Sequence, residues 1–134
     1  MKRGPARARD QKIKQIDKCI YWIYTDTIMN LYKEVQKCTG FQWDRYNIQK
    51  NWDKHGVSPV ESEQTFFNKP LLIAKDIQHS QEEDRFYVLG KTDQGRKLFI
   101  VFMIRKRPIR VISSRDMNRK ERRIYERREK EKNS

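Results

Sequence analysis

Residues 97–105 read KLFIVFMIR, the most apolar stretch of this 134-residue chain. A strand that is buried on both faces reads as a continuous apolar run, whereas a half-exposed strand alternates apolar and polar residues. The run therefore predicts a central strand that is buried on both faces. Because side chains alternate between the two faces, one face would carry Leu98, Ile100, Phe102 and Ile104, and the other Phe99, Val101 and Met103. The run is too short to span a bilayer.

Further strands are expected on both sides of this run. Residues 71–75 and 85–91 precede it, and residues 109–114 follow it. Residues 92–95, TDQG, have the composition of a hairpin turn between the second and third of these strands. Residues 41–43, FQW, alternate apolar and polar side chains, as a short strand does.

Two helices are expected between the first short strand and the others. Asp44 is a suitable N-cap for a helix over 45–55. Ser58 and Glu61 have the spacing of a capping box, with a proline between them at the first helical position. This pattern predicts a second helix over 59–67.

The last expected element is a helix over 118–131, in which Met117, Ile124 and Tyr125 form a thin apolar stripe. The resulting order is β-α-α-β-β-β-β-α. It predicts an α+β fold in which the helices pack against an antiparallel sheet.

The first 38 residues are interpreted as a separate basic appendage, and residues 39–134 as the main domain. Apolar residues recur at three- and four-residue steps over 10–37, so part of the appendage could be helical. A second interpretation takes Met29 as the true start of the protein.

Charge gives the first indication of function. The chain has 31 Lys and Arg against 18 Asp and Glu, a net charge of +13. A small protein with this excess usually binds a polyanion, with nucleic acid the first candidate and an acidic protein the second. The basic start of the chain is not followed by a signal-type apolar stretch. The two cysteines form no disulfide framework, so a cytoplasmic protein is expected.

Several short motifs, taken together and in order, resemble the BrnT family of toxins. They are FQWD at 41–44, NWDKHGVS at 51–58, EDRF at 83–86, Gly90, Val101-Phe102, IRVISSR at 109–115 and RKERRIYE at 119–126. The resemblance covers about residues 41–127.

The resemblance implies a RelE-like fold and the function of a small ribonuclease toxin that acts on RNA and inhibits translation. It also implies a BrnA-type ribbon-helix-helix antitoxin as partner. Through that antitoxin the complex would bind operator DNA, with a toxin dimer possible inside a heterotetramer. Two other functions stay open, a non-catalytic protein that binds RNA or the ribosome, and an inactive corepressor.

RNA cleavage without a metal needs a base for the 2′-OH, positive charge for the phosphorane and an acid for the leaving 5′-oxygen. Arginine suits the second role because its planar fork engages two phosphate oxygens. Arg115 is the first candidate and Arg85 the second, because each lies next to the end of an expected strand. The alternative for Arg85 is an ion pair with a neighbouring carboxylate.

His55 is the candidate acid or base, since its reference pKa lies near neutrality. Because it precedes a helix-ending glycine, its alternative role is to bond the last carbonyls of its helix. Glu121 could also face the RNA, with a role as a helix partner as the alternative. Lys54 is a candidate RNA-binding residue.

The last helix supplies candidates for sequence-independent attraction of phosphates, namely Arg119, Lys120, Arg122 and Arg123. The histidines and cysteines show no paired metal-ligand spacing. Neither a metal nor another cofactor is therefore expected.

Overall fold

The computed structural model describes residues 33, 35, 37–76, 84–104 and 107–133. The expected order of elements is confirmed: β1 (Phe41–Gln42), α3 (Arg45–His55), α4 (Pro59–Thr65), β2 (Leu72–Lys75), β3 (Arg85–Lys91), β4 (Lys97–Ile104), β5 (Ile109–Asp116) and α5 (Arg119–Asn133). Most of the helix expected over 10–37 lies outside the described residues, although Lys33 and Val35 are helical.

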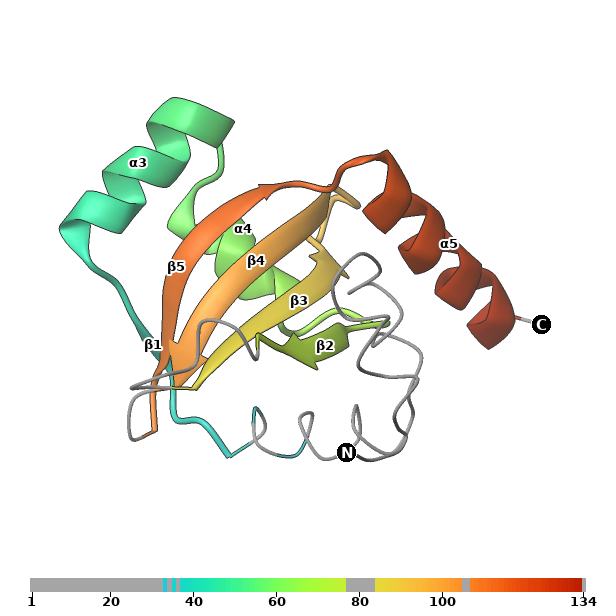
Figure 1. Cartoon of the computed structure of the whole chain (residues 1–134), viewed down its shortest axis with the longest axis horizontal. Helices are drawn as coiled ribbons and strands as arrows, with labels where there is room; N and C mark the ends of the chain where they lie inside the picture. The colour runs from blue at the N-terminus through green and yellow to red at the C-terminus, as the bar shows by residue number, and fades with distance from the viewer. Residues whose placement is uncertain (1–32, 34, 36, 77–83, 105–106, 134) are drawn as a thin grey trace, which may run out of the picture.

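The five strands form one sheet in the order β1-β5-β4-β3-β2, with β4 at the centre as predicted (Figure 1). Strands β2 to β5 are antiparallel to their neighbours. However, β1 runs parallel to β5, so the sheet is mixed rather than wholly antiparallel. Two helices and three strands separate β1 from β5 in the chain, and so long a connection does not impose the antiparallel pairing of a tight hairpin.

The predicted helix signals are confirmed. Asp44 Oδ1 accepts a hydrogen bond from the Tyr46 amide at 2.7 Å, and α3 ends at Gly56 with a left-handed φ of 63°. Helix α4 begins with the full capping box of Ser58 and Glu61. These local signals fix where both helices start and how the chain leaves the first one.

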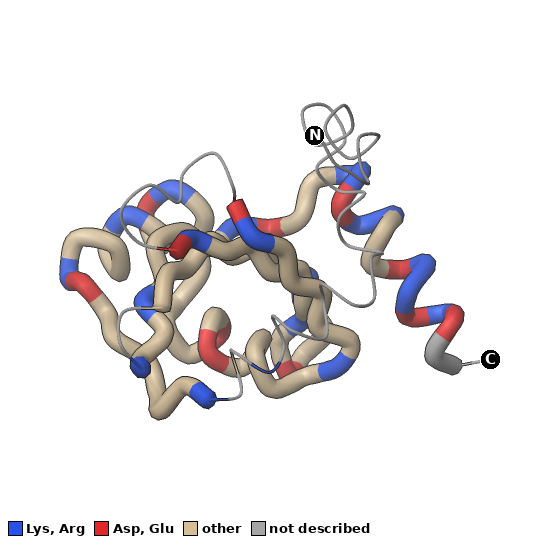
Figure 2. The backbone as a smooth tube through the Cα atoms, turned by 60° about the horizontal axis from the view of Figure 1, so that its bottom comes forward, with Lys and Arg blue, Asp and Glu red and all other residues tan. Residues whose placement is uncertain are grey.

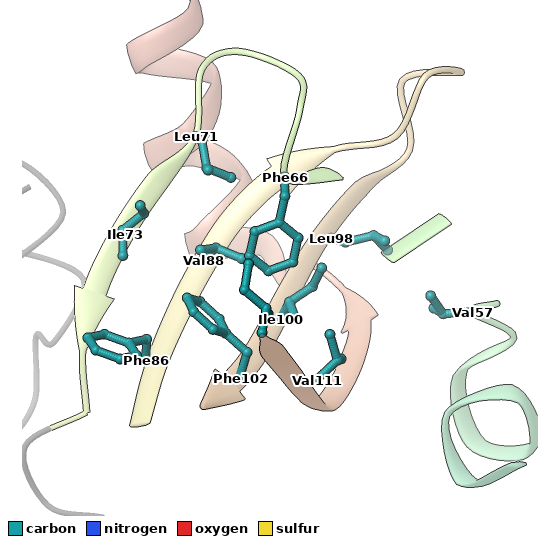
Figure 3. Close-up of a cluster of buried hydrophobic side chains, with 11 residues drawn as sticks. Val57, Phe66, Leu71, Ile73, Phe86, Val88, Leu98, Ile100, Phe102 and Val111 are labelled. Atoms are coloured by element: carbon teal, nitrogen blue, oxygen red, sulfur yellow. The ribbon is translucent and has the colours of Figure 1, made fainter. Parts of the chain in front are cut away.

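The main core lies between α4 and one face of the sheet (Figure 3). Leu98, Ile100 and Phe102 of β4 are fully buried there. A Cβ on Gly90 of β3 would lie 2.5 Å from the Thr65 methyl, so glycine allows α4 to approach the strand this closely. The other buried members of this cluster are Val57, Phe66, Leu71, Ile73, Phe86, Val88, Ile109 and Val111, and Val35 and Cys38 pack against it.

The opposite face of the sheet is covered less completely. Helix α5 packs a smaller cluster over the β2–β3 side, where the buried Tyr125 donates its hydroxyl to Pro70 O at 2.6 Å. Tyr125 is therefore the core anchor of its helix. Phe99, Val101 and Met103 on this face are only partly buried. Full burial of β4 is thus observed for Leu98, Ile100 and Phe102 but not for Ile104 or for the second face, where α5 covers only the β2–β3 side among the described elements.

Helix α3 lies alongside the outer edge of β5 (Figure 1). The Lys50 ammonium donates to Ile112 O at 3.1 Å, and the Ser114 amide donates to Asn51 Oδ1 at 3.2 Å. Side chains of α3 thus satisfy backbone groups of β5 that β1 is too short to reach. This arrangement places α3 at the border of the more open sheet face.

Candidate nucleic-acid interface

Three arginines lie on the sheet face away from α4. Side-chain alternation and strand register place Arg85 with Tyr87 on this face, and Arg110 and Arg115 with Phe99. We call these five residues the arginine face. The rings of Tyr87 and Phe99 lie 5.2 Å apart. Aromatic and arginine side chains together are what proteins use to stack and bind single-stranded RNA.

Arg115 and Glu121 are brought together as an ion pair. The two Nη atoms of Arg115 donate to the two carboxylate oxygens of Glu121, each at 2.9 Å. The guanidinium carbon also lies 4.2 Å from the centre of the Phe99 ring. Glu121 in turn forms a capping box with Asn118 at the start of α5. Both sequence candidates therefore lie where the arginine face meets α5.

Arg85 lies at the other end of the same face. It is opposite Met103 of β4, whereas Arg115 is opposite Phe99. Four residues of strand separate those two positions, about 13 Å at the usual rise. The two arginines therefore share a face but are not brought to a single point.

A row of side chains on α3 lies beside β5, and its middle member, Lys50, contacts the Ile112 carbonyl. Tyr46, Lys50 and Lys54 are spaced four residues apart, so they share one side of the helix. Burial and the positive charges of Lys54 and Arg85 lower the pKa of Lys50. We call Lys50, Lys54 and Arg85 the cationic cluster. Sequence analysis missed Lys50, although its spacing from Lys54 was a signal that could have found it.

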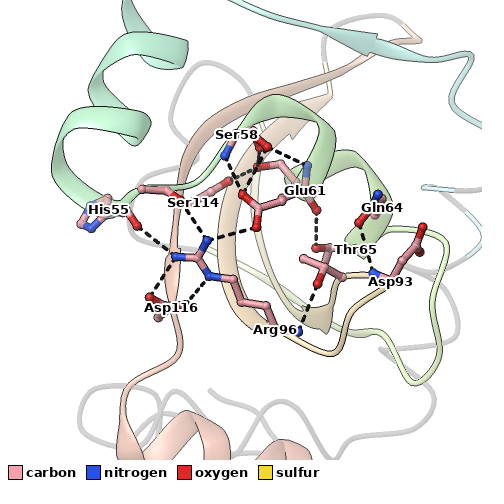
Figure 4. A network of polar contacts seen from close by, with 12 residues as sticks. His55, Ser58, Glu61, Gln64, Thr65, Asp93, Arg96, Ser114 and Asp116 are labelled. Carbon is pink, nitrogen blue, oxygen red and sulfur yellow. Dashed lines mark hydrogen bonds and ion pairs between the residues drawn. The ribbon is translucent and has the colours of Figure 1, made fainter.

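His55 lies on a different side of α3 and belongs to a polar network around Arg96 (Figure 4). Arg96 donates to the carbonyls of His55 at 3.0 Å and Gly56 at 2.9 Å. It also binds Asp116 through two bonds of 2.7 and 3.1 Å, and Glu61 at 3.1 Å. The arginine thus satisfies the last carbonyls of α3. His55 therefore takes part in this network through its carbonyl, on a different side of α3 from Lys50.

The Arg96 network shifts the titration of its members. Hydrogen bonds from Arg96 lower the pKa of Asp116, and the nearby charges of Arg122 and His55 lower it further. Burial raises the pKa of Glu61, but hydrogen bonds from Ser58 and Arg96 outweigh it, so the net pKa is lowered. The carboxylates in turn raise the pKa of Arg96. Sequence analysis did not identify Arg96, since its acceptors come from three separate elements.

Basic and acidic residues are interspersed along α5 (Figure 2), and the basic residues of its first two turns are exposed. They are Arg119, Lys120, Arg122 and Arg123. Acidic residues of the same helix alternate with them, and two of these bind the β3–β4 hairpin. Lys97 pairs with Glu126 and Lys91 with Glu129, each at 2.9 Å. The acidic side chains thus attach the helix to the sheet while the basic ones stay at the surface.

Within the described ranges, no three His, Cys, Asp or Glu side chains are grouped closely enough to hold a metal ion. In the same ranges no helix has the length and apolar character needed to cross a membrane.

A family model described as "Ribonuclease toxin, BrnT, of type II toxin-antitoxin system" matches residues 43–121. The chain belongs to the BrnT family. The matched segment contains the cationic cluster, the arginine face and Glu121. The crystal structure of the Brucella abortus ribonuclease toxin BrnT aligns with a TM-score of 0.46 at 18% identity, over 60% of this chain and 99% of that one. A search of curated proteins gave no significant match.

Proposed function

We propose that this BrnT-family chain is a metal-independent endoribonuclease that inhibits translation by cutting RNA. The observation that carries the proposal is the gathering of cations around one half-open sheet face inside the family-matched segment. Single-stranded RNA would lie across the arginine face, with bases against Tyr87 and Phe99 and phosphates toward the cations.

The chemistry proposed is attack of a 2′-oxygen on the adjacent phosphorus. The P–O bond to the 5′-oxygen breaks, which leaves a 2′,3′-cyclic phosphate and a 5′-hydroxyl. Arg115 would stabilise the phosphorane charge, and Arg85 and Lys54 would hold a neighbouring phosphate of the same RNA strand. Lys50 is the preferred group for moving a proton, because burial and the positive charges of Lys54 and Arg85 lower the pKa of its amine and so favour its neutral form more than in a free lysine.

His55 and Glu121 are weaker candidates for the proton transfers. The carbonyl of His55 is bound by Arg96, and its imidazole lies on another side of α3 from Lys50. Both carboxylate oxygens of Glu121 already accept hydrogen bonds from Arg115. Arg119, Lys120, Arg122 and Arg123 remain proposed as sequence-independent phosphate contacts at the edge of the site.

Membership of a type II family implies an antitoxin partner. We propose a BrnA-type ribbon-helix-helix protein, which would link the toxin to operator DNA. An excess of positive charge on the toxin would favour an acidic antitoxin segment. Co-expression should then relieve growth arrest and yield a complex that survives high salt.

The test is an RNA cleavage assay with purified protein in excess EDTA. Wild type should cut RNA to cyclic phosphate products. Arg115→Ala and Arg85→Ala should each lose about a hundred- to a thousand-fold in rate, as when a preorganised anion contact is removed. Arg128→Ala is the matched control, because Arg128 pairs with Glu131 near the end of α5 and outside the proposed site.

Three results would contradict the proposal in different ways. Loss of wild-type cleavage in EDTA would indicate a metal mechanism. Full activity in folded Arg115→Ala and Arg85→Ala proteins would remove the arginine face from the chemistry. RNA binding without any cleavage would favour the non-catalytic alternative. If the only activity found is operator binding together with the antitoxin, the corepressor alternative would be favoured.

A further inference from the structure

Glu121 makes two separate sets of contacts. Its backbone amide donates to Asn118 Oδ1 at 2.8 Å, and its Oε1 accepts from the Asn118 amide at 2.9 Å. Its two carboxylate oxygens also bind both Nη atoms of Arg115. The Glu121 side chain is only 13% exposed. One residue therefore both starts α5 and holds the guanidinium of Arg115.

These contacts leave one edge of Arg115 open. A guanidinium has five N–H donors. Two of them bind Glu121, and a third, from Nη1, binds Asp116 O at 3.0 Å. The described residues provide no acceptor for Nε, and this atom is not among their buried unsatisfied groups. The Nε edge of Arg115 is therefore reached by solvent, while its other edge and its ring-facing side are fixed.

We propose that Glu121 is a positioning residue that holds Arg115 on Phe99 with its Nε edge presented to an RNA phosphate. The proposal rests on the ribonuclease function proposed above and assigns Glu121 a role through Arg115 rather than in the proton transfers. Nε and the remaining Nη2 proton form a planar fork that fits two phosphate oxygens. Arg115 can therefore bind phosphate without releasing Glu121.

Preorganisation gives this arrangement its effect. A solvated arginine loses side-chain freedom when it binds phosphate. In this chain the Phe99 ring and the Glu121 carboxylate restrict that freedom before RNA arrives. A charged group already aimed at the reacting phosphate costs no reorganisation in the transition state. Loss of Glu121 should therefore lower kcat more than it weakens ground-state binding.

The two functions of Glu121 can be separated by substitution. Glu121→Gln keeps a side chain that is suited to the capping box but loses the charged, two-bond contact with Arg115. Asn118→Ala does the reverse, because it removes the cap and leaves the ion pair intact. It is the matched control and should lower the midpoint of urea unfolding.

The experiment measures kcat and KM for the four members of a cycle formed by Glu121→Gln and Arg115→Ala, together with Asn118→Ala. Glu121→Gln should lower kcat about tenfold in the wild-type background, a part of the loss expected for Arg115→Ala. It should have no further effect in the Arg115→Ala background. Asn118→Ala should keep wild-type kcat in the folded protein.

An equal loss of kcat from Glu121→Gln in both backgrounds would overturn the proposal, since Glu121 would then act without Arg115. Equal losses in Glu121→Gln and Asn118→Ala would reduce its role to the helix cap. Binding of a 2′-deoxy oligonucleotide is measured for the same four proteins. This probe cannot be cut by the proposed reaction, because it has no 2′-OH. If wild type binds this probe but cleaves no RNA, the ribonuclease function fails. Non-additive binding losses would then support the positioning role, and additive losses would overturn it.

Discussion

Two cationic residues at the sheet, Arg96 and Lys50, have opposite surroundings. Arg96 binds two backbone carbonyls and the carboxylates of Asp116 and Glu61, and the two carboxylates raise its pKa. Lys50 binds one carbonyl, and burial together with the charges of Lys54 and Arg85 lowers its pKa. One cation is stabilised by its neighbours, and the other is destabilised by them.

We propose that this difference separates a structural role for Arg96 from a functional role for Lys50. The Arg96 network joins the end of α3, the start of α4 and the end of β5 (Figure 4). The positive charge of Arg96 is therefore balanced by carboxylates of the same protein. Like charges held close together are unfavourable in the free protein, and an anionic ligand relieves that repulsion. Clusters of this kind are typical of sites that bind or transform anions.

The largest effect is expected from Lys50→Met, which keeps an unbranched side chain but removes the ammonium. RNA cleavage should fall about a hundred- to ten-thousand-fold, the range for loss of a group that moves a proton in the reaction. The free energy of unfolding should change by less than about 1 kcal/mol, because one hydrogen bond is lost while charge repulsion is relieved. Initial cleavage rates and urea unfolding measure the two quantities.

Arg45→Met is the matched control for this substitution. Arg45 is exposed at the start of the same helix and lies on a different side from Lys50. Cleavage by this variant should stay close to that of wild type. If Lys50→Met unfolds the protein instead, or if both variants lose activity equally, the contrast between Lys50 and Arg96 fails.

Arg96→Met should give the opposite result, with a loss of stability. It leaves two carboxylates without their cation and the end of α3 without a donor. We expect the free energy of unfolding to fall by about 2–3 kcal/mol, within the range for broken ionic networks. The midpoint of urea unfolding measures this loss. An unchanged midpoint would show that the network contributes nothing to stability.

Sequence patterns predicted the elements well because the signals were local. The central strand followed from a continuous apolar run, and the starts of α3 and α4 followed from Asp44 and the Ser58–Glu61 capping box. The parallel pairing of β1 with β5 was not predicted, because alternation over three residues carries no information about a partner 68 positions away. The division at residue 38 stays a prediction.

The site was less accessible to sequence reasoning. Arg115 and Glu121 were chosen separately, and their pairing depends on the turn between β5 and α5. The pKa of Lys50 is lowered by burial first and then by the charges of Lys54 and Arg85, and Arg96 finds its acceptors in three distant segments. Such sets depend on tertiary packing, so a local pattern can suggest their members but not their geometry.

The smallest expected effect is on the stability of the wild-type and Arg96→Met proteins at acidic pH. The pKa values of Asp116 and Glu61 are lowered in the folded state. Their contribution to stability is therefore present above the unfolded pKa values, near pH 4, and is lost as the pH falls through the lower folded values.

Arg96→Met removes the hydrogen bonds that do most to lower the pKa of Asp116. The charges of Arg122 and His55 still act on Asp116, and Ser58 still donates hydrogen bonds to Glu61. The variant should accordingly lose less stability than wild type between about pH 5 and pH 2. Urea midpoints measured across that range for both proteins give the two slopes. The plot of urea midpoint against pH should be steeper for wild type than for Arg96→Met. Parallel plots, or a steeper plot for the variant, would mean that Arg96 does not lower the pKa values of these carboxylates.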